Sequence, residues 1–227
     1  MKTILIRMTL CSVLCFTALF SGQTAGEESN RFRTIGGEIA PDDLYYDFKG
    51  AHTKISVIES ARSAFHEFAK AENISIYRLI PGADGTTARE EVAVADIANA
   101  GTRPLLVFLK HPDPAKPFKI VAVADDIPSF PFPSTRFMNF TDLDLAIEYG
   151  KDAIKVARQS IELFNSKSSS TEQPQTRYIT VKTTAPPASR LLYSNNWVVR
   201  PSQRTLVLIL PQEDGVKILR IADEKTQ

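Results

Sequence analysis

Short apolar runs separated by turn residues recur along most of the chain, and this pattern constrains the fold more than any other feature. Clear examples are Asn73–Ile80, Pro104–Lys110, Phe118–Asp125 and Thr205–Leu210. Each run has the length of a β-strand, and aliphatic or β-branched residues dominate it. Asp214-Gly215 separates two apolar runs and is a strong hairpin signal. The spacing of the runs predicts an all-β chain with an immunoglobulin-like β-sandwich fold.

One segment departs from the strand pattern. In Ser60–Glu72 the small and apolar residues recur at helical spacing, at positions 61, 64, 65, 68 and 69, with strong helix formers between them. The pattern predicts a short helix near residues 60–72. An extended strand that crosses the sandwich is the alternative.

Two stretches of the chain share a pattern. Arg103–Asp126 and Arg204–Glu224 begin 101 residues apart, and each has an arginine, an aliphatic run, a turn and a strand that ends in Ala-Asp. The Phe-Pro segment 128–133 lies between them, and its prolines disfavour helix and stiffen the chain. We therefore expect two lobes, residues 51–127 and 134–227, joined by this linker and preceded by an irregular arm at 26–50. One larger sandwich is the alternative.

The N-terminus has the pattern of a secretory signal peptide over residues 1–25. Lys2 and Arg7 flank the start, an apolar run follows from Met8 to Phe20, and small residues lead to Ala25. A membrane span needs about 20 residues, so the run is too short to cross a bilayer comfortably. We expect export to the periplasm or the extracellular space, cleavage after residue 25 or 26, and no membrane span in the mature chain.

Cleavage would also remove Cys11 and Cys15, which are the two cysteines of the chain. The mature protein could then form no disulfide and no thiolate metal site, and it would have no cysteine nucleophile. Its 25 basic and 26 acidic residues lack the basic excess of a nucleic-acid-binding protein. His52, His66 and His111 share no ligand spacing, so we expect no metal site.

Catalytic motifs are missing from the sequence. It has no Gly-x-Ser-x-Gly, Ser-x-x-Lys or His-Glu-x-x-His motif, no phosphate loop and no dinucleotide fingerprint. Asp125-Asp126 and Thr141–Asp144 lack the run of oxygen ligands that a calcium loop requires. The paired carboxylates of a glycosidase can lie anywhere in a sequence, but two small lobes leave little room for a deep cleft. We expect no enzyme activity, no catalytic residues and no cofactor.

Two longer segments carry a resemblance. Phe130–Gly150 contains a Phe-Pro stretch followed by the Arg-Phe-x-Asn strand Arg136–Asn139, and Tyr193–Leu210 contains Tyr-Ser-x-x-Trp followed by Arg-Thr-Leu. These signatures resemble those of an uncharacterised family of secreted bacterial β-sandwich proteins, over roughly Leu105 to the C-terminus. The resemblance implies the fold and export, and it implies no activity.

The most suggestive candidate site is the group Tyr193, Asn195, Asn196 and Trp197. In a carbohydrate-binding surface the rings would stack on a sugar and the amides would bind its hydroxyl groups. The alternative is a tryptophan in the sandwich core, with the Asn pair in a turn or bulge. For Asn139, a buried side chain that satisfies a strand end is favoured over ligand binding.

These observations predict a non-enzymatic exported protein that contacts an unknown envelope protein. Exposed sheet edges and the Phe-Pro linker are the two routes to such contacts. A connector whose Phe130 and Phe132 pack between the lobes is the alternative reading of the linker. The rival function is a carbohydrate-binding module that holds a polysaccharide at Tyr193 and Trp197.

Overall fold

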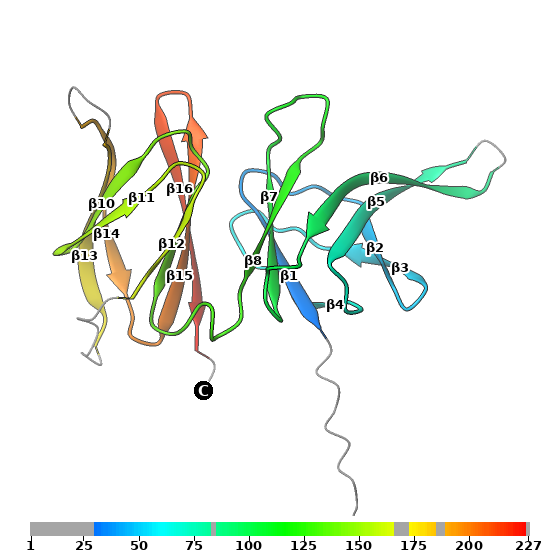
Figure 1. Ribbon diagram of the computed structural model, residues 1–227, viewed down its shortest axis with the longest axis horizontal. Coiled ribbons are helices and arrows are strands. Elements are labelled where there is room, and N and C mark those ends of the chain that lie inside the picture. Colours follow the sequence, from blue (N-terminus) through cyan, green and yellow to red (C-terminus); the bar gives the residue numbers. More distant parts are fainter. Residues whose placement is uncertain (1–29, 83–84, 166–172, 185–188, 226–227) are drawn as a thin grey trace, which may run out of the picture.

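The computed structural model describes residues 30–82, 85–165, 173–184 and 189–225. In this part of the chain it contains sixteen strands in four four-stranded sheets, and it contains no helix (Figure 1). The predicted all-β sandwich fold is therefore confirmed. No helix in the described ranges is long and apolar enough to cross a membrane. The expected signal peptide, residues 1–25, lies outside the described residues.

The first eight strands form one lobe. They are β1 (Arg31–Gly36), β2 (Leu44–Phe48), β3 (Ala51–Ile55), β4 (His66–Glu67), β5 (Asn73–Pro81), β6 (Thr87–Asp96), β7 (Pro104–Leu109) and β8 (Lys119–Ala124). The second lobe contains β9 (Thr135–Asn139), β10 (Leu145–Tyr149), β11 (Asp152–Val156), β12 (Ile161–Phe164), β13 (Gln175–Thr183), β14 (Leu191–Val199), β15 (Gln203–Gln212) and β16 (Gly215–Glu224).

The two lobes have the same topology. The sheets of the first lobe have the orders β4-β1-β7-β8 and β3-β2-β5-β6, and those of the second have β12-β9-β15-β16 and β11-β10-β13-β14. Each strand of the second lobe thus has its counterpart eight strands earlier. The pairs β1–β7 and β9–β15 are parallel, and the other pairs are antiparallel. An immunoglobulin domain has seven strands in the orders ABED and CFG, so the immunoglobulin-like part of the prediction is not confirmed.

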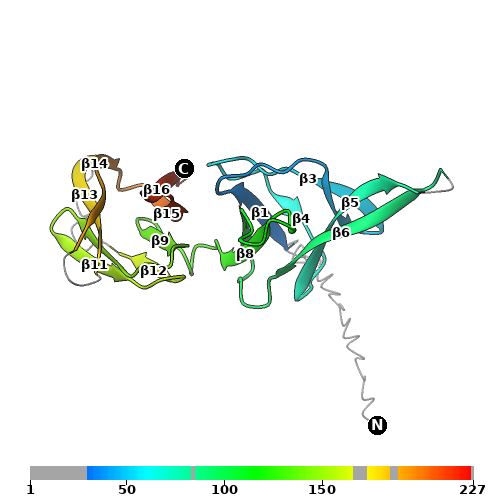
Figure 2. The same ribbon diagram turned by 90° about the horizontal axis from the view of Figure 1, so that it is seen from above.

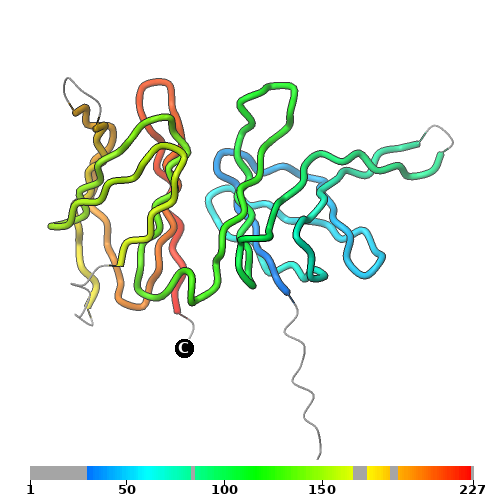
Figure 3. The backbone as a smooth tube through the Cα atoms, viewed as in Figure 1, coloured from blue at the N-terminus to red at the C-terminus, as the bar shows by residue number. Residues whose placement is uncertain are grey.

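The four sheets are stacked in layers, with an apolar core between each neighbouring pair (Figure 2). The first core lies between the two sheets of the first lobe, the middle core lies between the lobes, and the third core lies between the two sheets of the second lobe. The middle core belongs to both lobes, since residues of β1, β7 and β8 pack in it against residues of β9, β15 and β16. The chain passes from one lobe to the other along one edge of the two inner sheets, the lower edge in Figure 3. The lobes therefore share a core in addition to the covalent connection.

The aliphatic strands explain the stacking. In β7, Leu106 and Phe108 face the first core, while the alternate residues Leu105, Val107 and Leu109 face the middle core. In β15 the alternate side chains enter the middle and third cores in the same way. Every residue of β7 is buried, because its sheet is covered on both faces. Fully burying one such side chain contributes about 1.5–3 kcal/mol.

The predicted helix at 60–72 is wrong. The segment is extended, and its residues His66 and Glu67 form β4, which pairs with β1. Phe68 enters the first core, whereas Phe65 is exposed and lies against the guanidinium of Arg33. Helical spacing would place both rings on one face. Pairing with β1 and burial of Phe68 therefore override the local helix propensity.

The segment 26–50, which we expected as an irregular arm, contains β1 and β2. Each lies inside its sheet, β1 between β4 and β7 and β2 between β3 and β5. Charged and polar residues interrupt the apolar pattern of β1, and this weakens its signal in the sequence. Residues 26–29 lie outside the described part.

The Phe-Pro linker packs between the lobes. Phe130 is fully buried in the middle core, and the guanidinium carbons of Arg136 and Arg204 lie 4.3 and 4.8 Å from the centre of its ring. Phe132 is partly buried and also lies under Arg204. The segment therefore acts as a connector that is part of the core.

Candidate functional site

All four residues of the predicted binding group lie on β14, but they do not form one surface. Trp197 is 4% exposed and its ring packs in the third core, where Tyr193 contacts it. The indole Nε1 donates a hydrogen bond to Tyr193 Oη at 3.1 Å. Because the Trp197 ring is inside the sandwich, it offers no free face to a sugar.

The two asparagines of this group are exposed. The amide of Asn195 donates to Tyr193 Oη at 3.2 Å, and its Oδ1 accepts a hydrogen bond from the backbone N–H of Asn196 at 2.8 Å. Asn196 lies opposite Tyr178 of β13, whose side chain is exposed and donates to Ser194 Oγ at 3.1 Å. Asn195 thus covers one backbone donor of its own strand, and this is a structural role.

β14 is an edge strand. It pairs with β13 on one side, and no described strand pairs with its other side. Its nine residues, LLYSNNWVV, include no charged residue and no proline. Leu191 and Val198, near its two ends, are 56% and 49% exposed.

The counterpart of β14 in the first lobe is the edge strand β6, with the sequence TAREEVAVAD. It carries four charged residues, at positions 89, 90, 91 and 96. Charged side chains protect an open edge from pairing with another chain. The two equivalent edges therefore differ, because β6 has this protection and β14 does not.

Arg220 of β16 lies at one end of the β14 edge. Its Nη2 donates to the backbone carbonyl of Val198, and its guanidinium lies 5.2 Å from the centre of the Trp197 ring. Burial lowers the pKa of Arg220, and its buried Nε has no hydrogen-bond partner within the described part of the chain. A hollow of about 290 Å³ beside it is lined by Val198, Gln203 and Arg220, among others. The unpaired Nε is itself buried, and Nη2 already donates to Val198 and to Gln203, so Arg220 has a structural role at this end of β14.

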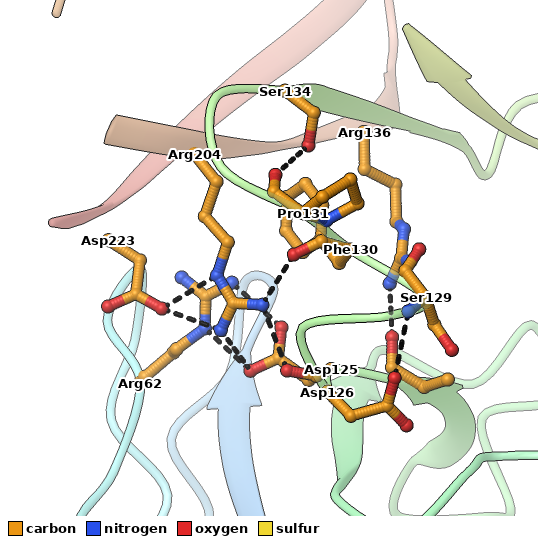
Figure 4. Close-up of polar contacts among 11 residues, drawn as sticks. Arg62, Asp125, Asp126, Ser129, Phe130, Pro131, Ser134, Arg136, Arg204 and Asp223 are labelled. Carbon is orange, nitrogen blue, oxygen red and sulfur yellow. Dashed lines mark hydrogen bonds and ion pairs between the residues drawn. The ribbon is translucent and has the colours of Figure 1, made fainter. Parts of the chain in front are cut away.

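A second polar group lies buried between the lobes (Figure 4). Arg62 of the first lobe binds both carboxylate oxygens of Asp125, at 3.0 and 3.2 Å. Arg204 of the second lobe binds Asp223 at 2.7 Å and Asp125 at 3.4 Å. The side chains of Arg62, Asp125 and Arg204 are 5–6% exposed. We call these four residues the inter-lobe ion cluster.

The residues around the ion cluster fix the linker. Arg136 donates to the carbonyl of Ser129 at 2.7 Å and to that of Ala124. Burial lowers the pKa of Arg136. Burial alone would raise the pKa of Asp126, but hydrogen bonds from Ser129 and from the backbone N–H of Thr102 outweigh it and lower that pKa. These contacts give Asp125 and Asp126 structural partners.

Asn139 has the structural role that the sequence favoured. It is 1% exposed, and its amide donates to the carbonyls of Leu143 and Ala157 at 2.8 and 2.9 Å. Its Oδ1 accepts the backbone N–H of Thr141 at 3.0 Å. The side chain thereby ties together the two loops that follow β9 and β11.

The histidines have separate environments. His52 lies 2.7 Å from the hydroxyl of Tyr77, His66 stacks on Phe32, and His111 lies in the loop after β7. In the described ranges, no group of three or more His, Cys, Asp or Glu side chains could hold a metal ion.

No protein-family model matches the chain, and no curated protein matches it. The resemblance to secreted β-sandwich proteins remains a prediction.

Proposed function

We propose that this chain is an exported, non-enzymatic β-sandwich protein that binds a protein partner in the cell envelope by adding a strand of that partner to β14. The observation that carries the proposal is the uncharged, unpaired edge of β14, in contrast to the charged edge of its counterpart β6 in the other lobe. The signal-peptide pattern of residues 1–25 supports export. The absence of catalytic motifs in the sequence supports a binding role.

An unpaired edge offers backbone N–H and C=O groups that a partner strand can bind, and side chains on the two faces supply specificity. On β14 the exposed Leu191 and Val198 provide apolar contacts near the two ends. The N–H of Asn196 is covered by the neighbouring Asn195 amide, which an incoming carbonyl can displace by a side-chain rotation. The edge therefore remains open to a partner strand.

The carbohydrate-binding alternative remains a prediction. The position of Trp197 in the third core does not favour it, because stacking on a sugar requires an accessible ring face.

Site-specific photo-crosslinking in the native envelope tests the proposal. A photoreactive residue at Asn196 is expected to yield one dominant protein adduct, and the same residue at Val94 of β6 is expected to yield none. Val94 and Val198 are both 49% exposed on edge strands, so Val94→Lys is a matched control for Val198→Lys. Val198→Lys should abolish the adduct at position 196, and Val94→Lys should leave it intact. Equal adducts from both strands, or an adduct that survives Val198→Lys, would contradict strand addition at β14.

A further inference from the structure

A hollow of about 560 Å³ lies between the lobes, at the edge of the inner sheets opposite the linker. The ends of β7 and β15 and the loop after β9 line it. Pro112, Pro211 and Phe140 give it apolar surface above the buried Leu109 and Leu210. Its charged lining residues are Lys110, Lys119, Glu38 and Asp142. We call it the inter-lobe hollow. Its volume falls in the range of small-molecule sites, about 300–1,000 Å³.

The duplication of the lobes makes the charges in this hollow informative. Lys217 in β16 pairs with Leu210, and Lys119 in β8 pairs with Leu109, so the two lysines occupy equivalent positions. Lys217 reaches across the interface to Glu38 and Glu59, at 3.7 and 3.8 Å. The ammonium group of Lys217 is therefore neutralised by carboxylates of the first lobe.

Lys119, the equivalent lysine of the first lobe, has no such partner among the described residues. Within the described part of the chain, neither Lys119 nor Lys110 forms an ion pair. The nearby carboxylate of Asp142 accepts a hydrogen bond from the Gln159 amide at 3.3 Å. Two ammonium groups without ion pairs in the described ranges, Lys110 and Lys119, therefore line the hollow with one such carboxylate, Asp142, while Glu38 is paired with Lys217.

The wall formed by Phe140 is held in place before any ligand arrives. The Phe140 backbone N–H donates to the carbonyl of Ile209 at 2.9 Å, and its own carbonyl accepts the Gln159 amide at 2.9 Å. Leu109 and Leu210 are 3% and 2% exposed and belong to the middle core. A preformed apolar wall lowers the ordering cost of binding.

We propose that the inter-lobe hollow binds a small organic carboxylate, with its apolar body over Phe140, Pro112 and Pro211 and its carboxylate at Lys110 and Lys119. Lys217 pairs with Glu38, so two lysines and one carboxylate of the lining remain without an ion pair to any described residue, and this favours an anion over an organic cation. The apolar surface favours a carboxylate with a hydrocarbon body over acetate or another small anion. This site is separate from the β14 edge, since no residue of β14 lines it. Failure of one proposal leaves the other untouched.

Octanoate is the probe, titrated into the protein produced from its full-length sequence and followed by calorimetry and by the melting temperature. We expect saturable binding and a melting temperature that rises with octanoate concentration. Octanol lacks the charge and acetate lacks the hydrocarbon body, so each should bind about tenfold more weakly or worse.

Three lysine variants locate the site. Lys110→Gln and the double variant Lys110→Gln/Lys119→Gln should weaken octanoate binding progressively, the double variant by about tenfold or more. Lys119 also borders a hollow beside β6, whereas Lys110 lines the inter-lobe hollow and not that one, so the single Lys110 variant separates the two sites. Lys155→Gln, at an exposed position of β11, is the matched control and should bind octanoate normally.

Unliganded melting curves of the variants show whether each is folded, since all three side chains lie at least partly in solvent. The proposal is overturned if octanol binds as tightly as octanoate, or if the double variant keeps full octanoate affinity. It is also overturned if no saturable binding appears below about 10 mM, which is weaker than a millimolar site.

Discussion

Replacing Arg204 by methionine should destabilise the whole stack. The guanidinium donates to Asp223 Oδ2 at 2.9 and 2.7 Å, and to the carbonyls of Asp125 and Phe130, both at 2.9 Å. Methionine removes the cation and leaves these acceptors in a site where the side chain of Asp125 is 5% exposed. Breaking a buried ion pair by removing one partner costs about 3–5 kcal/mol.

The structure supplies a matched control for this variant. Arg103 is the counterpart of Arg204 in the repeat. It directly precedes Pro104, which pairs with Ala124, and Arg204 directly precedes Thr205, which pairs with Ala222. Arg103 is exposed, so Arg103→Met should change stability by less than about 0.5 kcal/mol. The two arginines thus occupy equivalent places in the repeat but differ in burial.

Urea unfolding and calorimetry measure both variants. At about 2–4 °C per kcal/mol for a chain of this size, Arg204→Met should lower the melting temperature by roughly 6–20 °C. Arg204→Lys should fall between wild type and methionine, because one ammonium cannot replace the planar fork. A loss below about 1 kcal/mol for Arg204→Met, or equal losses for Arg204 and Arg103, would refute the role given to the inter-lobe ion cluster.

Further variants test the packing. Phe130→Ala should cost about 3–5 kcal/mol in urea unfolding, since the ring is fully buried between the lobes. Gly101→Ala should cost more than Gly50→Ala: both have positive φ, but a Cβ at Gly101 would lie 2.2 Å from Asp126 Oδ2, and one at Gly50 meets nothing within 4 Å. Burial lowers the pKa of His66 below its usual 6.5, so stability from this site is complete above that pH and falls as the pH drops through the lowered value. An NMR titration should place this pKa below 6.5, and a value above it would contradict the assigned burial.

The aliphatic strands can be recognised in the sequence, but the stacking of the four sheets cannot be predicted from it. The uninterrupted runs of β7 and β15 are typical of strands covered on both faces, and that signal was available. β1 and β4 were missed because long-range pairing stabilises them, while their own residues are polar or suit a helix. Local propensity carries no information on such partners.

The candidate site, like the fold, could be predicted from the sequence only in part. The sequence drew attention to Tyr193–Trp197 because of its aromatic and amide groups, but its unpaired edge follows from the sheet order. The inter-lobe ion cluster combines residues as distant as Arg62 and Asp223, whose proximity only the folded chain reveals. In the inter-lobe hollow, the unpaired state of Lys119 becomes meaningful through comparison with its equivalent in the other lobe.

Hydrogen exchange of the β14 amides, with and without the partner captured from position 196, tests strand addition most directly. Added backbone hydrogen bonds slow the exchange of the strand that receives them. The account predicts slower exchange across 191–196 in the complex and unchanged exchange in β6. Contact through side chains alone would leave the β14 amides exchanging as in the free protein, and that result, or protection confined to β6, would contradict the proposed function.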